Sequence, residues 1–358
     1  MRVAIDAREL CGRPTGVGRY LSGLLDAWAT SARAQRHEWL LLSHAPIARP
    51  PEWPVQAAIV NGGGGTAWEQ LSLPRALAAH RPDVVFSPGY TAPVTVATPL
   101  VLTIHDVSFF AHREWFSFRE GTRRRLLTAW SARRARTVIT DSQFSRGEIQ
   151  RFIGINTSRI RVIPLGMNQP VADDRRTREP MVLFAGSIFA RRRVDRLMAA
   201  FDAVIARVPD ARLEIVGENR SDLVLETVRR QSRHPDRIAI RSYVDEATLR
   251  DLYRRASVFA FLSEYEGFGL TPLEALAAGV PPVVLDTPIA REICDAAATY
   301  VSATATNDEV AAAIAELMTS ETARRSALAQ APSVLRRFDW TRTADDTLSV
   351  LEEAARGR

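Results

Sequence analysis

The chain contains 358 residues, of which 46% are hydrophobic and 25% are charged, and its formal net charge is +6. This composition is typical of a globular protein, the length allows two domains of ordinary size, and no apolar run reaches the roughly 20 residues that a membrane-spanning helix requires. All 47 basic residues are arginine, which excludes the lysine of a P-loop and the lysine that binds pyridoxal phosphate.

The start of the chain and the two cysteines bear on the cellular compartment. Residues 1–6 enter a strand at once and include no hydrophobic segment of the kind found in signal peptides. Cys11 and Cys294 lie far apart and belong to no metal-ligand pattern. We therefore expect a cytoplasmic protein with free thiols and no metal site.

Short β-branched segments alternate with helical ones in the first half, which predicts a parallel sheet covered by helices. The expected strands are residues 2–6, 39–43, 57–60, 84–87, 100–104, 137–140 and 160–163. The expected helices are residues 17–29, 68–79, 113–134 and 142–152.

Two motifs in this half adjoin predicted elements. Gly16 and Gly18 open the first long helix, where a glycine backbone can approach a ligand and the helix N-terminus attracts an anion. A plain turn would also explain these glycines. His105 and Asp106 follow the strand 100–104, so His105 could contact a sugar hydroxyl or a developing charge, or could be purely structural.

The excess of positive charge lies in the first half, mostly within residues 113–136. This segment predicts a basic amphipathic helix, which is usually a solvated face but can also lie on an anionic membrane surface. Contact with nucleic acid is not expected, because no binding motif is present and the second half is acidic. The candidate apolar positions are Trp115, Phe116, Phe118, Leu126, Leu127 and Trp130.

Residues 168–180 interrupt the alternation with charged residues and prolines, which indicates a linker between domains. A second alternating series follows. Its expected strands are residues 181–185, 212–216, 238–241, 258–261 and 282–285, and its expected helices are residues 194–208, 223–233, 246–254, 272–278 and 308–319, with a final helix at 339–355. The pattern predicts an α/β protein with two Rossmann-like domains facing across a cleft.

Gly186 and Ser187 follow the strand 181–185, and Arg191 and Arg192 open the next helix. Glycine allows close backbone approach, and arginine forms paired charged contacts, so the segment suits a diphosphate. A solvated basic face is the alternative, although fixed cations at a helix N-terminus are unfavourable unless an anion is present.

Two carboxylates flank a glycine turn in residues 266–274. Glu266 follows the strand 258–261 and so lies at the edge where open α/β sheets bind ligands. Glu274 could contact the same polyhydroxylated ligand, or could serve only as the third residue of a capping box that begins at Thr271. The backbone amides expected to face the ligand belong to Gly267, Phe268, Gly269 and Leu270.

Together these motifs resemble the retaining glycosyltransferases of family 4, which have the GT-B fold. The resemblance covers nearly the whole chain. It is carried by residues 16–20, 103–109, 140–145, 162–166, 184–187, 213–217 and 266–279.

The resemblance implies an acceptor-binding domain at 1–167, the linker 168–180, a nucleotide-sugar-binding domain at 181–338 and a helix at 339–358 that packs back on the first domain. It implies that Glu274 binds the ribose, that Glu266 and the amides of 267–270 face the donor sugar, and that Arg191 and Arg192 neutralise the diphosphate. It also implies that Gly16 and Gly18 approach the donor phosphates and that His105, beside Asp106, faces the transferred sugar. Arg192 stands where the family usually carries lysine, and Arg193 where asparagine is common.

These expectations describe a metal-independent retaining hexosyltransferase, since no Asp-x-Asp motif is present. GDP-mannose is the first donor to consider. The expected acceptor is a hydroxyl of a glycan or lipid-linked saccharide in cell-surface polysaccharide synthesis, at the inner face of the cell membrane. The alternatives are a sugar-nucleotide epimerase or hydrolase on the same fold, and a non-catalytic sugar-nucleotide-binding module.

Overall fold

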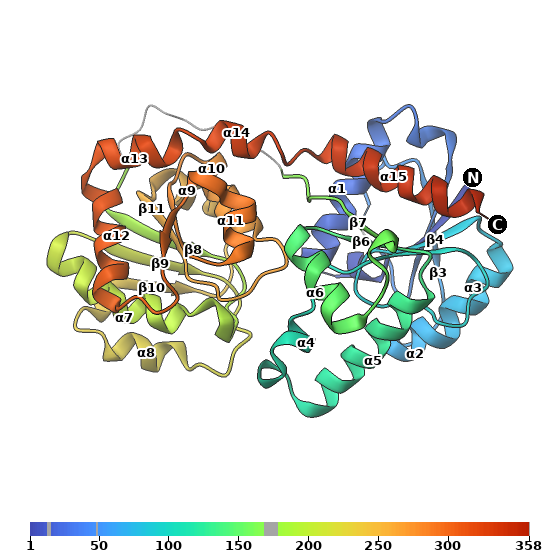
Figure 1. Cartoon of the computed structure of the whole chain (residues 1–358), viewed down its shortest axis with the longest axis horizontal. Helices are drawn as coiled ribbons and strands as arrows, with labels where there is room; N and C mark the ends of the chain where they lie inside the picture. The colour runs from blue at the N-terminus through green and yellow to red at the C-terminus, as the bar shows by residue number, and fades with distance from the viewer. Residues whose placement is uncertain (13–15, 48, 168–177, 358) are drawn as a thin grey trace. The chain divides into compact units, whose positions relative to one another are not determined.

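The computed structural model describes residues 1–12, 16–47, 49–167 and 178–357. The chain divides into two compact units (Figure 1): the first combines Met1–Gly166 with Phe338–Arg358, and the second is Met167–Arg337. Most of the predicted linker 168–180 lies outside the described residues.

The first unit is built on a seven-stranded parallel sheet with the order β3-β2-β1-β4-β5-β6-β7. Successive strands run outward from β1 to β3, and the chain then returns to the other side of β1 with β4. The point between β1 and β4 is therefore a topological switch point, where open parallel sheets bind ligands beyond the carboxyl ends of their strands. The strands are β1 (Arg2–Asp6), β2 (Glu38–Ser43), β3 (Val55–Ile59), β4 (Val84–Ser87), β5 (Leu100–Thr103), β6 (Thr137–Thr140) and β7 (Ile160–Val162).

The strands of this sheet are apolar because helices cover it, as in other parallel sheets. Val3, Ala4 and Ile5 of β1 are fully buried. The longer helices are α1 (Gly16–Thr30), α3 (Leu73–His80), α5 (Phe118–Arg134), α6 (Gln143–Ile153) and α15 (Trp340–Arg356), and the short ones include α2 (Gly65–Ala67) and α4 (Ser108–Ala111).

The last helix, α15, completes the first unit by packing on α1 and over β4, β5 and β6. The packing at its start is close: a Cβ atom at Gly23 of α1, or at Gly166 after β7, would lie 2.4 Å from the Trp340 side chain. Leu348 and Leu351 are fully buried on its inner face.

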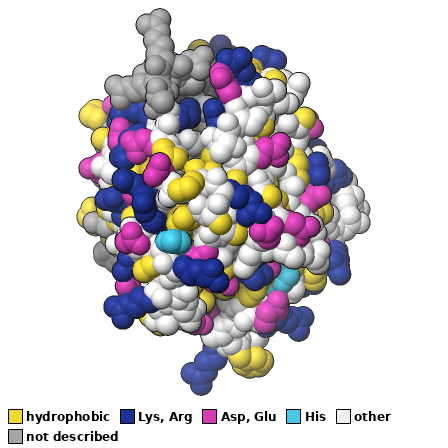
Figure 2. Space-filling model, turned by 90° about the vertical axis from the view of Figure 1, so that its left-hand side faces the viewer, with side chains coloured by type: hydrophobic (Ala, Val, Ile, Leu, Met, Phe, Trp, Pro, Cys, Tyr) yellow, Lys and Arg dark blue, Asp and Glu magenta, His cyan; other side chains and the backbone are white. Residues whose placement is uncertain are grey.

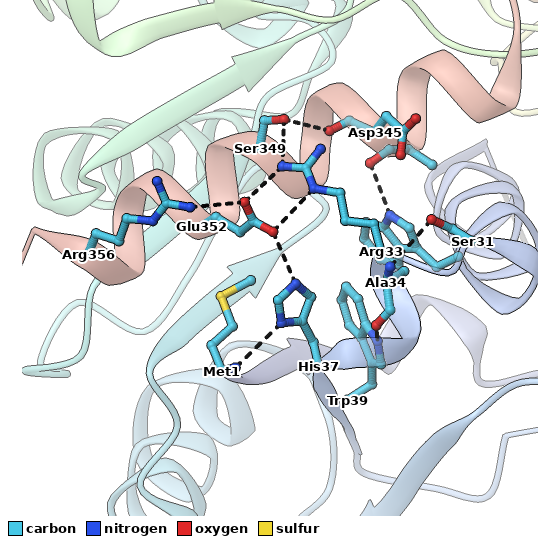
Figure 3. A network of polar contacts seen from close by, with 12 residues as sticks. Met1, Ser31, Arg33, Ala34, His37, Trp39, Asp345, Ser349, Glu352 and Arg356 are labelled. Atoms are coloured by element: carbon cyan, nitrogen blue, oxygen red, sulfur yellow. Dashed lines mark hydrogen bonds and ion pairs between the residues drawn. The ribbon is translucent and has the colours of Figure 1, made fainter.

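Polar contacts hold the far end of α15 in place (Figure 3). The Arg33 guanidinium donates to Glu352 at 2.8 and 3.3 Å and to Ser349 Oγ at 3.1 Å. His37 Nε2 lies 3.1 Å from the same Glu352 carboxylate, and the amino group of Met1 lies 3.4 Å from His37 Nδ1. The N-terminus of the chain is thereby linked to the last helix.

The second unit repeats the architecture with a six-stranded parallel sheet in the order β10-β9-β8-β11-β12-β13. Its switch point lies between β8 and β11. The strands are β8 (Met181–Ala185), β9 (Arg212–Val216), β10 (Ile238–Arg241), β11 (Val258–Phe261), β12 (Pro282–Leu285) and β13 (Thr299–Val301), and the helices are α7 (Val194–Arg207), α8 (Leu225–Gln231), α9 (Glu246–Arg255), α10 (Leu270–Ala277), α11 (Pro288–Cys294), α12 (Asn307–Thr319), α13 (Glu321–Leu328) and α14 (Ala331–Leu335).

Basic and acidic side chains are interspersed on the face of the second unit drawn in Figure 2. Elsewhere in the contacts of this unit, Nη2 of Arg207 in α7 donates to both carboxylate oxygens of Asp308 in α12, at 2.8 and 2.9 Å. A mixed surface of this kind produces no large field of one sign. No helix of the described residues is both long and apolar enough to cross a bilayer.

The structure confirms the fold class and corrects two predicted helices. The expected helix 68–79 is divided into a π-helical turn at Trp68–Ser72 and the α-helix α3. The expected helix 113–134 is a 3₁₀ turn followed by α5, which begins after Ser117. The strand β13 and the helices α2, α4, α11, α13 and α14 were not expected.

The structure also decides on the capping box, which was one of two alternatives for Glu274. Helix α10 begins at Leu270 and its N-cap is Gly269, with φ of 103°, so Thr271 lies inside the first turn. The buried Thr271 Oγ1 accepts and donates no hydrogen bond among the described residues. Glu274 therefore cannot be explained as the third residue of a capping box.

Candidate functional site

The candidate site of the second unit lies at its switch point, where the chain leaves β8 and β11. Gly186 follows β8 directly and has φ of 131°, a conformation that side-chain-bearing residues rarely adopt. A Cβ atom there would lie 2.8 Å from Arg192 Nη1. Glycine is therefore required for the Arg192 side chain to pass close to this backbone.

Arg192 forms a buried ion pair with Glu266. Its Nε and Nη2 donate to the two carboxylate oxygens at 2.7 and 3.1 Å, and both side chains are 13% exposed. Arg192 Nη1 also donates to the Ser187 carbonyl at 2.9 Å, and the Ser263 hydroxyl donates to Glu266 Oε1 at 2.9 Å. The loops after β8 and β11 are thus joined by a charged, geometrically fixed pair.

These contacts decide the charge of Glu266. Burial alone would raise the pKa of its carboxyl, but Arg192, Arg191 and the Ser263 hydroxyl outweigh burial and lower it. Glu266 is therefore a carboxylate near neutral pH. Because it accepts three hydrogen bonds, it is held in one orientation.

Arg191 differs from its neighbour because no carboxylate of the described residues forms an ion pair with it. Its guanidinium carbon lies 4.4 Å from the centroid of the Phe189 ring. Its buried Nε atom also has no hydrogen-bond partner in the described parts of the chain. Arg191 is consequently a cation of the site without an ion-pair partner among the described residues, and an anion could supply that partner.

A pocket adjoins Glu266 and reaches the start of α10. Its lining includes Phe261, Ser263, Glu266, Phe268, Gly269 and Cys294, so it is mostly apolar with one carboxylate. Such a lining is typical of a small-molecule site. Gly267 and Leu270 belong to the same turn.

Glu274 lies on α10. The Tyr253 hydroxyl of α9 donates to Glu274 Oε2 at 3.3 Å. The structure therefore brings Gly186, Ser187, Arg192 and Glu266 into contact, and it places Glu274 on the helix that begins beside them.

The first unit holds His105 at the carboxyl end of β5. Its Nδ1 lies 2.7 Å from Asp141 Oδ2, and its Nε2 lies 2.9 Å from the Pro88 carbonyl oxygen. Both neighbours are acceptors, so both ring nitrogens must donate and the geometry favours the imidazolium. Burial opposes this charge, but Asp141 and the Pro88 carbonyl raise the pKa of His105.

Asp106 supports the same loop. Its Oδ1 accepts from the Ser108 amide at 2.8 Å at the start of α4, and its Oδ2 accepts from the Tyr90 hydroxyl at 3.2 Å. Gly16 opens α1, and Gly18 is buried within it. The beginning of α1 lies close to the loop after β4, since a Cβ atom at Gly89 would lie 2.8 Å from a methyl carbon of Val17.

Sequence reasoning missed Asp141 as the partner of His105. The signal was available: Asp141 directly follows β6, and β5 and β6 are neighbours in the sheet. Parallel neighbours end at the same edge, so residues that follow them can meet. Among the described residues, no group of three or more His, Cys, Asp or Glu side chains could hold a metal ion.

Two family models match the chain on either side of residue 168. Residues 14–169 match the model described as Glycosyltransferase Family 4, and residues 168–333 match the model described as Glycosyl transferases group 1.

Individual relatives and a solved structure agree with these matches. A glycogen synthase from Mycobacterium tuberculosis is 29% identical over 290 residues, which span 77% of this chain and 70% of that protein. The GDP-mannose:cellobiosyl-diphosphopolyprenol alpha-mannosyltransferase of Komagataeibacter xylinus is 27% identical over 269 residues, covering 70% of this chain and 66% of that one. The structure of sucrose-phosphate synthase from Thermosynechococcus elongatus superposes with a TM-score of 0.81 at 18% identity over 100% of both chains, which shows a shared fold.

The two matched segments together run from residue 14 to residue 333, and the fold built from the two Rossmann-like sheets is GT-B. The chain therefore belongs to the group 1, family 4 glycosyltransferases and is a retaining enzyme that transfers a sugar from a nucleotide sugar.

Proposed function

We propose that the enzyme transfers a hexose, with mannose favoured, from a nucleotide diphosphate sugar to a hydroxyl of a glycan or lipid-linked saccharide in cell-surface polysaccharide synthesis. One observation carries the proposal: Arg191, which forms no ion pair among the described residues, acts electrostatically on a fixed carboxylate, Glu266, at the switch point of the second sheet. A cation that lacks an anion, next to a carboxylate that can accept sugar hydroxyls, suits a sugar diphosphate.

The contacts of Arg191 and Arg192 support different roles for the two side chains. Glu266 already neutralises the Arg192 guanidinium, so Arg192 positions Glu266 and the Gly186–Ser187 backbone. Arg191 then supplies the main side-chain charge to the diphosphate. Gly186 and Ser187 supply close backbone approach, and the amides of Gly267–Leu270 supply the positive end of α10.

The transfer step requires no nucleophile from the protein, because the acceptor oxygen attacks the anomeric carbon directly. The bond between the anomeric carbon and the β-phosphate oxygen breaks, and its electron pair leaves with the diphosphate. The acceptor oxygen bonds to the anomeric carbon on the same face, and its proton passes to a donor phosphate oxygen. Arg191 stabilises the charge that develops on the diphosphate, and Glu266 orients the donor sugar.

The remaining donor contacts follow from their positions. Glu274 would accept hydrogen bonds from the ribose hydroxyls, since it takes no part in capping α10. Gly16 and Gly18 would approach the donor phosphates. His105 would act on the transferred sugar as a charged group held by Asp141, and Asp106 would support its loop through Tyr90 and Ser108.

Mannose is favoured as the transferred sugar because one relative that spans most of the chain is named a GDP-mannose-dependent alpha-mannosyltransferase. The name of that relative also includes a diphosphopolyprenol-linked saccharide. A lipid-linked saccharide acceptor is the corresponding proposal for this chain.

Donor binding tests the proposal directly. GDP-mannose, UDP-glucose and UDP-N-acetylglucosamine are each titrated into the protein, and binding is measured by thermal shift and calorimetry. We expect GDP-mannose to bind and Arg191→Ala to weaken its affinity about 10- to 100-fold, the effect of losing charge-assisted hydrogen bonds. Arg230→Ala, at an exposed position of α8, is the matched control.

Three results would contradict the proposal. Binding that is unaffected by Arg191→Ala would remove Arg191 from the donor site. Consumption of the donor without any acceptor would indicate an epimerase or hydrolase. Tight donor binding without turnover, against a broad panel of acceptors, would indicate a non-catalytic module.

The proposal also includes peripheral contact between α5 and an anionic membrane surface, at the cytoplasmic side. Phe118, Leu126 and Trp130 are 84%, 48% and 52% exposed. At 100° per residue these positions span about 120° of the helix. Exposed arginines fall within or beside the same arc, and they are Arg119, Arg123 and Arg133. Basic and aromatic side chains on one helix face are typical of membrane-surface binding.

Cosedimentation with vesicles tests this contact. We expect binding to phosphatidylcholine vesicles that contain phosphatidylglycerol, but not to phosphatidylcholine alone, and release at high salt. Phe118→Ser should weaken the binding. Leu71→Ser, at a position 58% exposed outside α5, is the control. Equal binding to both vesicle types would contradict the proposal.

A further inference from the structure

A second polar cluster lies at the switch point of the first sheet, between the ends of β1 and β4. Asp6 is the last residue of β1, Arg8 follows it, and Thr91 belongs to the loop after β4. Glu69 joins them from the π-helical turn Trp68–Ser72. The cluster thus occupies, in the first unit, the position that Arg192 and Glu266 occupy in the second.

Arg8 is held between two buried carboxylates. Its Nη2 contacts Glu69 Oε1, lies 3.2 Å from Asp6 Oδ2 and donates to Thr91 Oγ1 at 3.2 Å. Glu69 also accepts from Thr91 Oγ1 at 2.6 Å and from the Gln70 side-chain amide at 3.0 Å. The side chains of Asp6 and Glu69 are 2% and 1% exposed, whereas that of Arg8 is 14% exposed.

The cluster leaves hydrogen-bonding capacity unused. Nη2 is the sole atom of the Arg8 guanidinium that contacts protein acceptors among the described residues, so Nε and Nη1 retain their donors. Asp6 Oδ2 is buried and, apart from its ion pair with Arg8, accepts no hydrogen bond in the described chain. Buried polar atoms are normally satisfied, so an unsatisfied one at a ligand-binding edge requires a reason.

The backbone around Glu69 is also unusual. A π-turn is rare, interrupts a helix at an energetic cost, and occurs often at functional sites. Here it places the Glu69 carboxylate against Arg8 and Thr91. The π-turn thus contributes a buried carboxylate to the cluster.

The charges of the cluster define the ligand it can accept. One guanidinium faces two carboxylates, and Glu9 adds a further negative charge close enough to raise the pKa of Asp6. Burial is the largest cause of the shift, and with all neighbours acting the pKa of Asp6 is raised to about 6. The cluster has no surplus positive charge, so it cannot compensate a phosphate, whereas hydroxyl groups can accept hydrogen bonds from Nε and Nη1 of Arg8.

We propose that Asp6, Arg8 and Glu69 form the acceptor subsite of the enzyme and that this subsite takes a neutral, hydroxyl-bearing sugar ring rather than a phosphorylated one. The proposal rests on the glycosyltransferase function proposed above. Arg8 contacts the ring hydroxyls directly. Glu69 and Thr91 act as positioning residues because they fix the Arg8 guanidinium.

Direct binding of saccharides tests the subsite without the transfer reaction. Saturation-transfer NMR measures the binding of methyl α-mannoside and cellobiose, as neutral probes, and of mannose 6-phosphate to the wild-type protein. We expect the neutral probes to bind more tightly than the phosphate. Arg8→Gln should weaken neutral binding about tenfold or more, since it removes charge-assisted donors. Arg75→Gln, an exposed position on α3, is the matched control.

Glu69→Gln provides the second arm, because it keeps the size of the side chain and removes one negative charge. We expect it to shift the binding ratio toward mannose 6-phosphate about tenfold, which loss of a structural contact alone would not do. Glu52→Gln, at an exposed position, is its control. This arm remains informative if Arg8→Gln fails to fold.

Several outcomes would overturn the inference. These are tighter binding of mannose 6-phosphate by the wild type, no binding of the neutral probes, unchanged neutral binding by folded Arg8→Gln, or an unchanged ratio in Glu69→Gln. The thermal shift with GDP-mannose is measured on the same preparations. If the wild-type protein shows no thermal shift with GDP-mannose, the proposed function is refuted. If the shift is present and any of the outcomes above is observed, only the acceptor subsite is refuted.

Discussion

Removal of one partner from the ion pair between Arg192 and Glu266 should destabilise the second unit strongly. The shortest contact of this pair is 2.7 Å and both side chains are 13% exposed. At an effective dielectric constant of 20, this separation gives an attraction of about 6 kcal/mol. Desolvation of the two ions offsets much of it, but removal of one partner from a buried pair costs about 3–5 kcal/mol because the other charge stays buried.

A double-mutant cycle separates these contributions. Arg192→Gln and Glu266→Gln each leave one buried charge, whereas the double variant leaves none. We expect each single variant to lose about 3 kcal/mol and the double variant to lose less than the sum, with a coupling of about 2–3 kcal/mol.

Native-state hydrogen exchange in urea measures this coupling in the full-length protein. Amides of β8 and β11 report the opening of the second unit by itself, so a separate transition of the first unit does not interfere. Additive losses, within about 0.5 kcal/mol, would show that the two charges do not interact and would refute the reasoning.

Further predictions concern single groups. The stability that the His105 imidazolium contributes should be fully present below the pKa of histidine in the unfolded chain, and it should be lost as pH rises through the raised pKa of His105 in the folded protein. In calorimetry, Asp141→Asn should make the melting temperature depend less on pH over this range. Because the folded pKa of Asp6 is raised to about 6 from 3.8, its ionisation should destabilise the protein by up to about 3 kcal/mol as pH rises from 4 to 6, a slope that urea titrations of Asp6→Asn should lack. Gly186→Ala should displace Arg192 and reduce the thermal shift with GDP-mannose, and an undiminished shift would contradict the geometry. Leu348→Ala should lower the free energy of unfolding of the first unit by about 3 kcal/mol in hydrogen exchange, and a loss below about 1 kcal/mol would show that α15 packs loosely.

The strands were predicted well because parallel sheets bury both faces and require continuous apolar segments. Residues 84–87, 137–140, 181–185, 212–216 and 258–261 are strands with the predicted bounds. The short edge strand β13 was missed, since an edge strand with one partner needs less apolar sequence. The fold class followed from the alternation of strands and helices.

Helix starts were predicted less well, and the reasons are tertiary. The Thr271–Glu274 spacing fits a capping box, but the chain turns earlier at Gly269, whose positive φ a side chain would disfavour. The apolar residues of the segment 68–79 have an unbroken helical periodicity. The π-turn at its start includes Glu69, which contacts Arg8, a residue distant in sequence. Neither the start of α10 nor the π-turn at Trp68–Ser72 can be predicted from the local sequence.

Part of the candidate site was accessible from sequence because it follows from strand ends. Gly186, Arg192 and Glu266 all lie just beyond β8 or β11. The pairing of Arg192 with Glu266, which distinguishes it from Arg191, depends on which loops are neighbours. Arg191 and Arg192 are adjacent and have the same sequence context, so only the folded structure distinguishes their roles.

The first unit is discontinuous in sequence, because α15 belongs to it although the whole second unit lies between. During synthesis on a ribosome, residues 1–166 emerge long before the helix that buries their remaining apolar surface. That surface stays open while some 170 residues of the second unit are made. Folding of the earlier unit therefore finishes last, and the nascent chain must remain protected from aggregation until its final helix has been translated.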